Sequence, residues 1–110
     1  MDLDDVERDA LVRLFFEESE EGLAAMEQAL LALEERPHDR AALQTLFRVA
    51  HTLKGNAGSL GFADLAAVTH GLEAVLDRLR GGALGMTREA GDLLLESVDV
   101  LRAMLVRARG

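Results

Sequence analysis

The chain has no cysteine, no tryptophan and no tyrosine, and Pro37 is the only proline among its 110 residues. Without cysteine it can form no disulfide and no thiolate metal site, which fits a reducing cytoplasm. Leu, Ala and Glu are abundant, whereas β-branched and aromatic residues are scarce, and this bias favours helix over strand. The composition therefore predicts an all-α protein.

Long apolar runs and positive charge are scarce as well. No stretch approaches the roughly 18–20 apolar residues that a membrane span needs, and the acidic beginning MDLDDVERDA is unlike a secretory signal. Twenty acidic residues against twelve basic ones give a formal net charge of −8, which repels phosphate backbones and anionic lipid surfaces. We therefore expect a cytoplasmic protein that has no nucleic-acid or membrane partner.

The length and the apolar content suit one folded domain. A chain of 110 residues with 49% hydrophobic residues can bury a real core, and domains cluster around 100–150 residues. No internal repeat, low-complexity tract or linker divides the sequence. We predict a single domain over residues 1–110.

Four amphipathic stretches follow one another along this domain. Their apolar residues recur at helical spacing and predict helices at about Asp5–Glu35, Asp39–Gly61, Ala63–Arg80 and from Thr87 onward. Asp4 with Glu7 imitates a capping box, Asp39 and Thr87 are good N-caps, and the glycine-rich segment 81–85 indicates a loop. Because all three connections are short, sequential helices should lie antiparallel, which predicts an up-down-up-down four-helix bundle.

The apolar stripes of these helices give the predicted core. The stripe residues are Leu11, Phe15, Gly22, Met26, Leu30 and Leu33 in the first helix, Leu43, Leu46, Phe47, Ala50, Leu53 and Ala57 in the second, Leu65, Val68, Leu72, Leu76 and Leu79 in the third, and Ala90, Leu93, Leu94, Ser97, Val98, Leu101, Met104, Leu105 and Ala108 in the fourth. We interpret them as packing residues and not as a cofactor site.

The segment HTLKGNAGSLGF, residues 51–62, contains three glycines, although glycine in a helix interior costs roughly 0.5–1 kcal/mol relative to alanine. At 3.6 residues per turn, Gly55 and Gly58 share a face with His51 and leave its surroundings bare of side chains. Lys54 places an ammonium group near the same ring. The pattern indicates a place where an anionic group can bind and a second protein can approach.

The third predicted helix offers His70 and Glu73, which are three residues apart and therefore share a face. In an antiparallel pair of helices joined near Gly61, that face can lie beside His51. A carboxylate that accepts a hydrogen bond from Nδ1–H would leave Nε2 with a free lone pair and would stabilise positive charge on the ring. This reasoning makes His51 a candidate nucleophile oriented by Glu73.

The pattern HxxKGxxxxxG, which begins at His51 and includes Lys54 and Gly55, resembles the signature of histidine phosphotransfer (HPt) domains. The fuller text FRVAHTLKGNAGSLGF, followed by THGLE at Thr69–Glu73, is similar to the N-terminal phosphotransfer domain of chemotaxis histidine kinases of the CheA type. The resemblance covers about residues 11–107.

This resemblance implies that His51 accepts a phosphoryl group from an ATP-dependent histidine kinase domain and passes it to an aspartate of a response regulator. It also implies that Glu73 bonds the imidazole, that Lys54 stabilises the phosphoryl charge, that His70 supports the network and that Gly55 admits the partner. No Walker motif GxxxxGK[ST] and no kinase loop HRDxxxxN occurs. We therefore expect a carrier that is inert toward ATP alone and has no cofactor or metal, with ATP and Mg²⁺ bound by partner domains.

Several alternatives remain open. The chain can be a fragment of a larger multidomain histidine kinase, which its abrupt end after RARG favours, or a stand-alone or hybrid-kinase HPt protein. A metal-binding bundle has little support, because the only Glu-x-x-His pair, Glu35 and His38, straddles Pro37. A purely structural interaction module leaves the bare surface around the imidazole unexplained. For Gly71, within a helix, close packing is the only reason we can offer.

Overall fold

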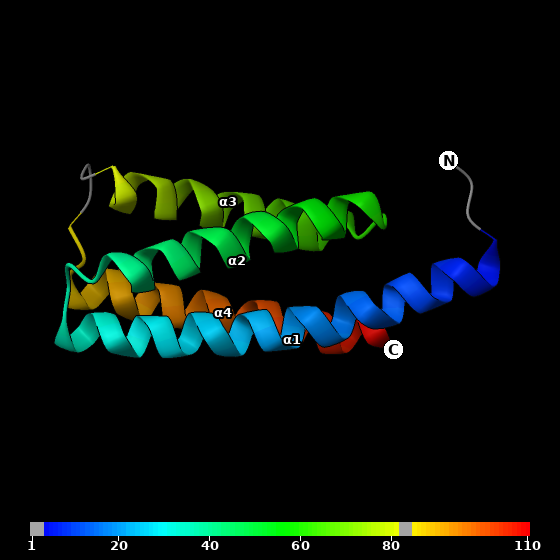
Figure 1. Cartoon of the computed structure of the whole chain (residues 1–110), viewed down its shortest axis with the longest axis horizontal. Helices are drawn as coiled ribbons and strands as arrows, with labels where there is room; N and C mark the ends of the chain where they lie inside the picture. The colour runs from blue at the N-terminus through cyan, green and yellow to red at the C-terminus, as the bar shows by residue number, and fades with distance from the viewer. Residues whose placement is uncertain (1–3, 82–84) are drawn as a thin grey trace.

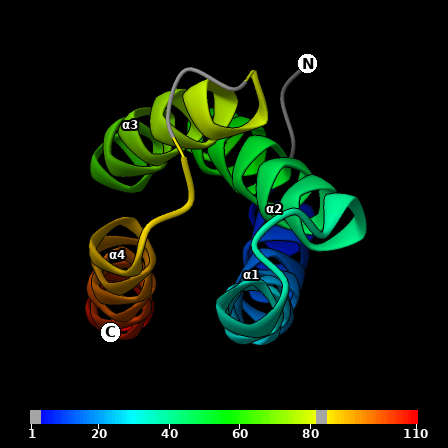
Figure 2. The same ribbon diagram turned by 90° about the vertical axis from the view of Figure 1, so that its left-hand side faces the viewer.

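The chain folds into four helices in the computed structural model, which describes residues 4–81 and 85–110. They are α1 (Asp5–Glu35), α2 (Arg40–Ser59), α3 (Ala63–Arg80) and α4 (Arg88–Arg109), and the described residues contain no strand. Consecutive helices run in opposite directions (Figure 1) and occupy the four corners of a bundle in chain order (Figure 2). The predicted antiparallel four-helix bundle is confirmed. Residues 82–84 of the predicted loop lie outside the described residues.

The predicted helix starts are confirmed by their caps. The side chains of Asp4, Asp39 and Thr87 each accept a hydrogen bond from the backbone N–H three residues further on, at 2.8, 3.2 and 3.1 Å. Each cap satisfies one of the N–H groups that the first turn of a helix leaves without a partner. Short polar side chains therefore define where α1, α2 and α4 begin.

The connection between α2 and α3 is a tight turn built on Gly61, whose φ of 86° is a left-handed conformation that glycine adopts without steric cost. The N–H of Gly61 donates to the carbonyl of Gly58 at 3.2 Å, and the N–H of Phe62 donates further back in α2 at 2.9 Å, a Schellman pattern. The ring of Phe62 packs on Phe15 and Phe16 of α1, with centroids 5.3 and 5.5 Å away.

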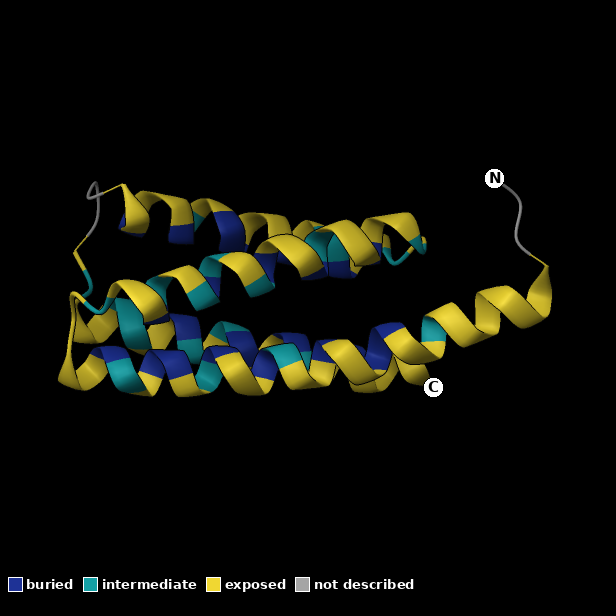
Figure 3. Cartoon of the chain, in the orientation of Figure 1, coloured by how far each residue is buried: buried dark blue, intermediate teal, exposed yellow. Residues whose placement is uncertain are grey.

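The core runs along the inside of all four helices, where the buried residues face one another (Figure 3). Its largest fully buried apolar side chains are Leu23, Met26, Leu33, Leu46, Val98, Leu101 and Leu105. Burying a side chain of this kind contributes roughly 1.5–3 kcal/mol. None of the helices in the described part of the chain combines the length and the hydrophobicity that a membrane span requires.

Four predicted core residues are wrong: Leu11, Val68 and Leu93 are 41%, 37% and 56% exposed, and Ala108 in the last turn of α4 is exposed as well. The 31 residues of α1, at about 1.5 Å each, match the 46 Å length of the molecule, so its first turns extend beyond the other helices (Figure 1). Leu11 lies near this free end. Val68 lies on α3 and Leu93 on α4, and these two helices have the least contact of any neighbouring pair. Neither helix therefore covers the full width of the other's apolar stripe.

Candidate functional site

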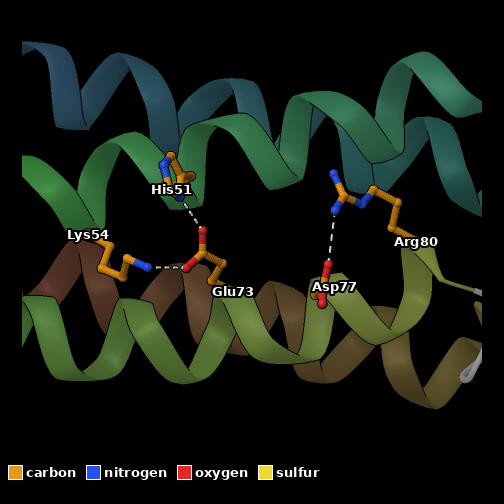
Figure 4. A network of polar contacts seen from close by, with 5 residues as sticks. All are labelled: His51, Lys54, Glu73, Asp77 and Arg80. Carbon is orange, nitrogen blue, oxygen red and sulfur yellow. Dashed lines mark hydrogen bonds and ion pairs between the residues drawn. The ribbon is translucent and has the colours of Figure 1, made fainter.

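The central feature of the candidate site is a hydrogen bond between α2 and α3. His51 lies on the outer face of α2, and its Nδ1 is 2.6 Å from Oε2 of Glu73 on α3 (Figure 4). The side chain of His51 is 66% exposed, whereas that of Glu73 is only 12% exposed. The antiparallel arrangement set by the Gly61 turn therefore brings together the two residues that the sequence analysis paired.

Lys54 completes this group from one turn further along α2. Its ammonium donates to Oε1 of Glu73, so one oxygen of the carboxylate bonds Lys54 and the other bonds His51 (Figure 4). The hydrogen bond from Lys54 is the main reason that the pKa of Glu73 lies below its usual value of 4.5, and the contact with His51 lowers it further. Burial of the carboxyl acts in the opposite direction, but the two contacts prevail. Glu73 is therefore ionised at neutral pH.

The ionised carboxylate determines which ring nitrogen of His51 carries the proton. A carboxylate can only accept hydrogen bonds, so Nδ1 must be the donor in the contact with Glu73. In the neutral imidazole, the lone pair then lies on Nε2. This lone pair belongs to a side chain that is 66% exposed, and the opposite nitrogen of the ring is bonded to a negative charge, which also stabilises an imidazole gaining positive charge.

The other predicted site residues surround this pair in different ways. His70 is exposed on α3 and lines the same open hollow as His51 and Glu73, but among the described residues it makes no hydrogen bond to them. A Cβ built on Gly55 or Gly58 would meet nothing within 4 Å. The two glycines therefore leave open space beside the imidazole. Packing inside the bundle does not require glycine at either position.

Sequence reasoning missed two residues beside the site. Phe47, which we assigned only to the apolar stripe of α2, lies parallel to the His51 ring, with an interplanar angle of 6° and centroids 6.4 Å apart. The guanidinium carbon of Arg80 lies 3.9 Å from the centroid of the Phe47 ring, and Arg80 also bonds Asp77 at 3.0 Å. The spacing of four residues between Phe47 and His51 could have indicated the first contact, because such residues share a helix face.

The described residues contain no group of three or more His, Cys, Asp or Glu side chains that could hold a metal ion. The pair Glu35 and His38 flanks the break between α1 and α2, as expected, and both residues are exposed. The geometry of the described part of the chain thus gives the metal-binding alternative no support.

Comparison with known proteins assigns the chain to a family. The Hpt domain family matches residues 10–109, so the chain belongs to the Hpt domain family. Among curated relatives, it is 37% identical over 105 residues to the chemotaxis protein CheA of Borreliella burgdorferi. The aligned region covers 96% of this chain and 12% of that protein. The chain spans only 12–14% of the length of the first curated relatives that it matches, all of them CheA proteins.

Solved structures give the same assignment. The CheA phosphotransferase domain from Thermotoga maritima matches with a TM-score of 0.83 and 33% identity, covering 90% of this chain and 94% of that one. The phosphorylated P1 domain of CheA3 from R. sphaeroides, solved in complex with CheY6, also has a TM-score of 0.83, with 34% identity and coverage of 90% and 77%. The chain is thus similar in sequence and fold to phosphotransfer domains of CheA proteins.

Proposed function

We propose that this domain carries phosphoryl groups in a chemotaxis-type two-component system and that His51 is the residue that carries them. The lone pair on Nε2 attacks the γ-phosphorus of ATP held by a histidine kinase domain, the bond to the β-phosphate breaks, and ADP leaves. A carboxylate oxygen of an aspartate on a response regulator then attacks the phosphorus of the phosphohistidine. The N–P bond breaks, and its electron pair returns to Nε2.

One observation carries this proposal: the Nδ1 side of the imidazole is bonded to Glu73 while the side chain as a whole is 66% exposed. A histidine that serves only packing would bury its ring or bond both nitrogens inside the protein. Phosphoryl transfer asks little covalent chemistry of a protein beyond orientation and charge stabilisation. The contact with Glu73 supplies the orientation, and the exposure lets Nε2 reach a phosphorus atom in another protein.

The neighbours of His51 receive supporting roles in this proposal. Lys54, which lies on the same helix face, stabilises the charge of the phosphoryl group, and His70 supports the network from the edge of the same hollow. Gly55 and Gly58 allow the partner's surface to come close, because nothing fills the space where their side chains would be. The CheA3 P1 domain solved in its phosphorylated form with CheY6 supports a receiver of the CheY type as the second partner.

We also propose that the domain works as one part of a multidomain histidine kinase, since the curated relatives that it matches are CheA proteins of much greater length. In that setting, ATP and Mg²⁺ bind to the kinase domain, and the phosphoryl transfer takes place in the cytoplasm. A stand-alone HPt protein is the other possibility. The natural gene decides between them: a reading frame that continues into dimerisation and ATP-binding regions supports the kinase.

The proposed carrier function is tested by incubating the domain with the kinase domain of a CheA protein, radiolabelled ATP and Mg²⁺. We expect a label that is labile in acid and stable in base, that requires the kinase, and that moves to a CheY-type receiver when one is added. His51→Gln should keep the helical content of the parent domain and take up no label. Full labelling of His51→Gln would show that the acceptor is another residue, and no labelling of the parent by a competent kinase would refute the carrier function.

A further inference from the structure

The hydrogen bond to Glu73 restrains Nδ1 of the His51 ring, which is otherwise held only by its covalent bond to Cβ. Small changes in the side-chain torsions can still tilt the ring plane, and such a tilt moves Nε2 and its lone pair. The exposure of the side chain leaves this motion room. In-line attack on phosphorus needs the reacting atoms close together with their orbitals aligned, so a second constraint on the ring plane would favour transfer.

The ring of Phe47 is the nearest aromatic surface that can provide this constraint. Phe47 precedes His51 by one helical turn on α2, and the two rings are parallel to within 6°. Phe47 is half-buried and lines the same hollow as His51 and Glu73. The ring of Phe47 can restrict the ring of His51 only if Phe47 is itself held in place. The contact that holds it has to come from the α3 side of the hollow.

Arg80 fixes the ring of Phe47 from α3. Its guanidinium carbon lies 3.9 Å from the ring centroid, within the range of a cation–π contact. The guanidinium also bonds the carboxylate of Asp77 at 3.0 Å, and Figure 4 shows this pair on the same helix as Glu73, one to two turns further along it. The antiparallel helices thus join His51 and Glu73 at one level and Phe47 and Arg80 at the next.

We propose that Phe47 and Arg80 are positioning residues for phosphoryl transfer: Arg80 holds the ring of Phe47, and Phe47 restricts the plane of the His51 imidazole. Neither residue touches the phosphoryl group in this scheme. The inference rests on the proposed role of His51, but it makes a statement about ring geometry that can be measured in the unphosphorylated domain without any partner.

The test compares Arg80→Gln with Arg78→Gln. Both arginines are exposed in the last turn of α3, and among the described residues Arg78 makes no ion pair, so it is the matched control. Three measurements are made on each variant. The first is the NMR signals of the His51 ring protons, which respond to the ring current of Phe47. The second and third are the rate of labelling by the kinase domain with ATP and the rate of phosphorylation by phosphoramidate. Phosphoramidate passes its phosphoryl group to an imidazole nitrogen with loss of ammonia and needs no docking surface.

We expect Arg80→Gln to shift the His51 ring signals and to slow phosphorylation by both donors by about two- to five-fold, the factor that an exposed cation–π contact can supply. Arg80→Lys, which keeps a cation near the ring, should be closer to the parent, and Phe47→Leu should shift the signals most. Arg78→Gln should change none of the three measurements. Unfolding in urea verifies that each variant is folded, and Arg80→Gln and Arg80→Lys keep the inference testable if Phe47→Leu unfolds.

Two outcomes would overturn the inference. One is an Arg80→Gln variant whose ring signals and rates equal those of the parent. The other is a loss of rate with the kinase domain alone, which would mean that Arg80 contacts the kinase and does not position the ring. Failure of the proposed function is seen separately, because the parent domain would then take up no label from a competent kinase domain, while the ring signals and the phosphoramidate rates of the variants can still be compared.

Discussion

Glu73 accepts a hydrogen bond from Nδ1 of His51 at 2.6 Å, although 22 positions separate the two residues in the chain. The other oxygen of the same carboxylate is bonded by Lys54. One buried carboxylate therefore joins the orientation of the imidazole to the position of the nearest ammonium.

Replacing Glu73 by alanine should slow phosphorylation of His51 by about ten-fold or more, because a hydrogen bond that involves a charged group is worth roughly 1.5–3 kcal/mol. The bundle should remain folded, since the core residues are unchanged and Lys54 can be solvated. The measurement is the initial rate of labelling by the kinase domain. Glu73→Gln is the control, because its amide oxygen can still accept from Nδ1 without the charge, and it should give an intermediate rate. An unchanged rate in Glu73→Ala would remove its orienting role.

The stability of the domain should depend on pH through Glu73. Since the pKa of Glu73 in the folded protein is lowered below 4.5, chiefly by Lys54, its ionised form stabilises the fold above that pH. This contribution is lost as the pH falls through the folded-state pKa. The difference in unfolding free energy between the parent and Glu73→Gln, measured in urea from about pH 7 to about pH 3, should therefore shrink below pH 4.5.

Lys54→Met provides the control for this pH dependence. Without the ammonium, the pKa of Glu73 should move back toward 4.5, so its contribution to stability should be smaller than in the parent, and its loss should be complete at a higher pH. A difference that stays constant over the whole pH range would mean that Glu73 has the same pKa in the folded and unfolded states.

Adding a large side chain at Gly55 should block partners and leave the fold intact. Nothing lies within 4 Å of a Cβ at this position, so Gly55→Leu places its side chain in solvent beside His51. We expect transfer from the kinase domain and to the receiver to fall by about 10- to 100-fold, the effect of displacing reacting groups by about 1 Å. Phosphorylation by phosphoramidate should be unchanged. A loss of rate with both donors would instead mean that the substitution disturbs the imidazole.

Two other helical glycines should respond to alanine in opposite directions. A Cβ at Gly22 of α1 would lie 2.9 Å from Cγ1 of Val49 on α2, so Gly22→Ala should force the helices apart and destabilise the bundle by about 1–3 kcal/mol. A Cβ at Gly71 meets nothing within 4 Å, so Gly71→Ala should stabilise it by roughly 0.5–1 kcal/mol through helix propensity. Urea unfolding measures both changes, and equal effects of the two substitutions would contradict this reading of the packing.

The open space around Gly71 corrects our explanation of that residue by close packing, which holds instead for Gly22. Sequence spacing placed Gly22 in an apolar stripe, but it could not distinguish a glycine whose Cβ would meet the Val49 side chain from one whose Cβ would meet open space. That distinction depends on the distance between two helices at one level of the bundle. No local pattern in the chain encodes such a distance.

The helices, their caps and their antiparallel order follow from the amino-acid sequence alone, because propensity, capping and short connections act over a few residues. The same holds for the pairing of His51 with Glu73, since the turn at Gly61 and the helical repeat leave little freedom between them. The packing of the helices against one another settles which apolar residues stay exposed, as at Leu11 and Val68, and which side chains reach across from another helix. The contact of Arg80 with Phe47 is of this second kind, because it depends on how closely α2 and α3 approach and on the direction of a long flexible side chain.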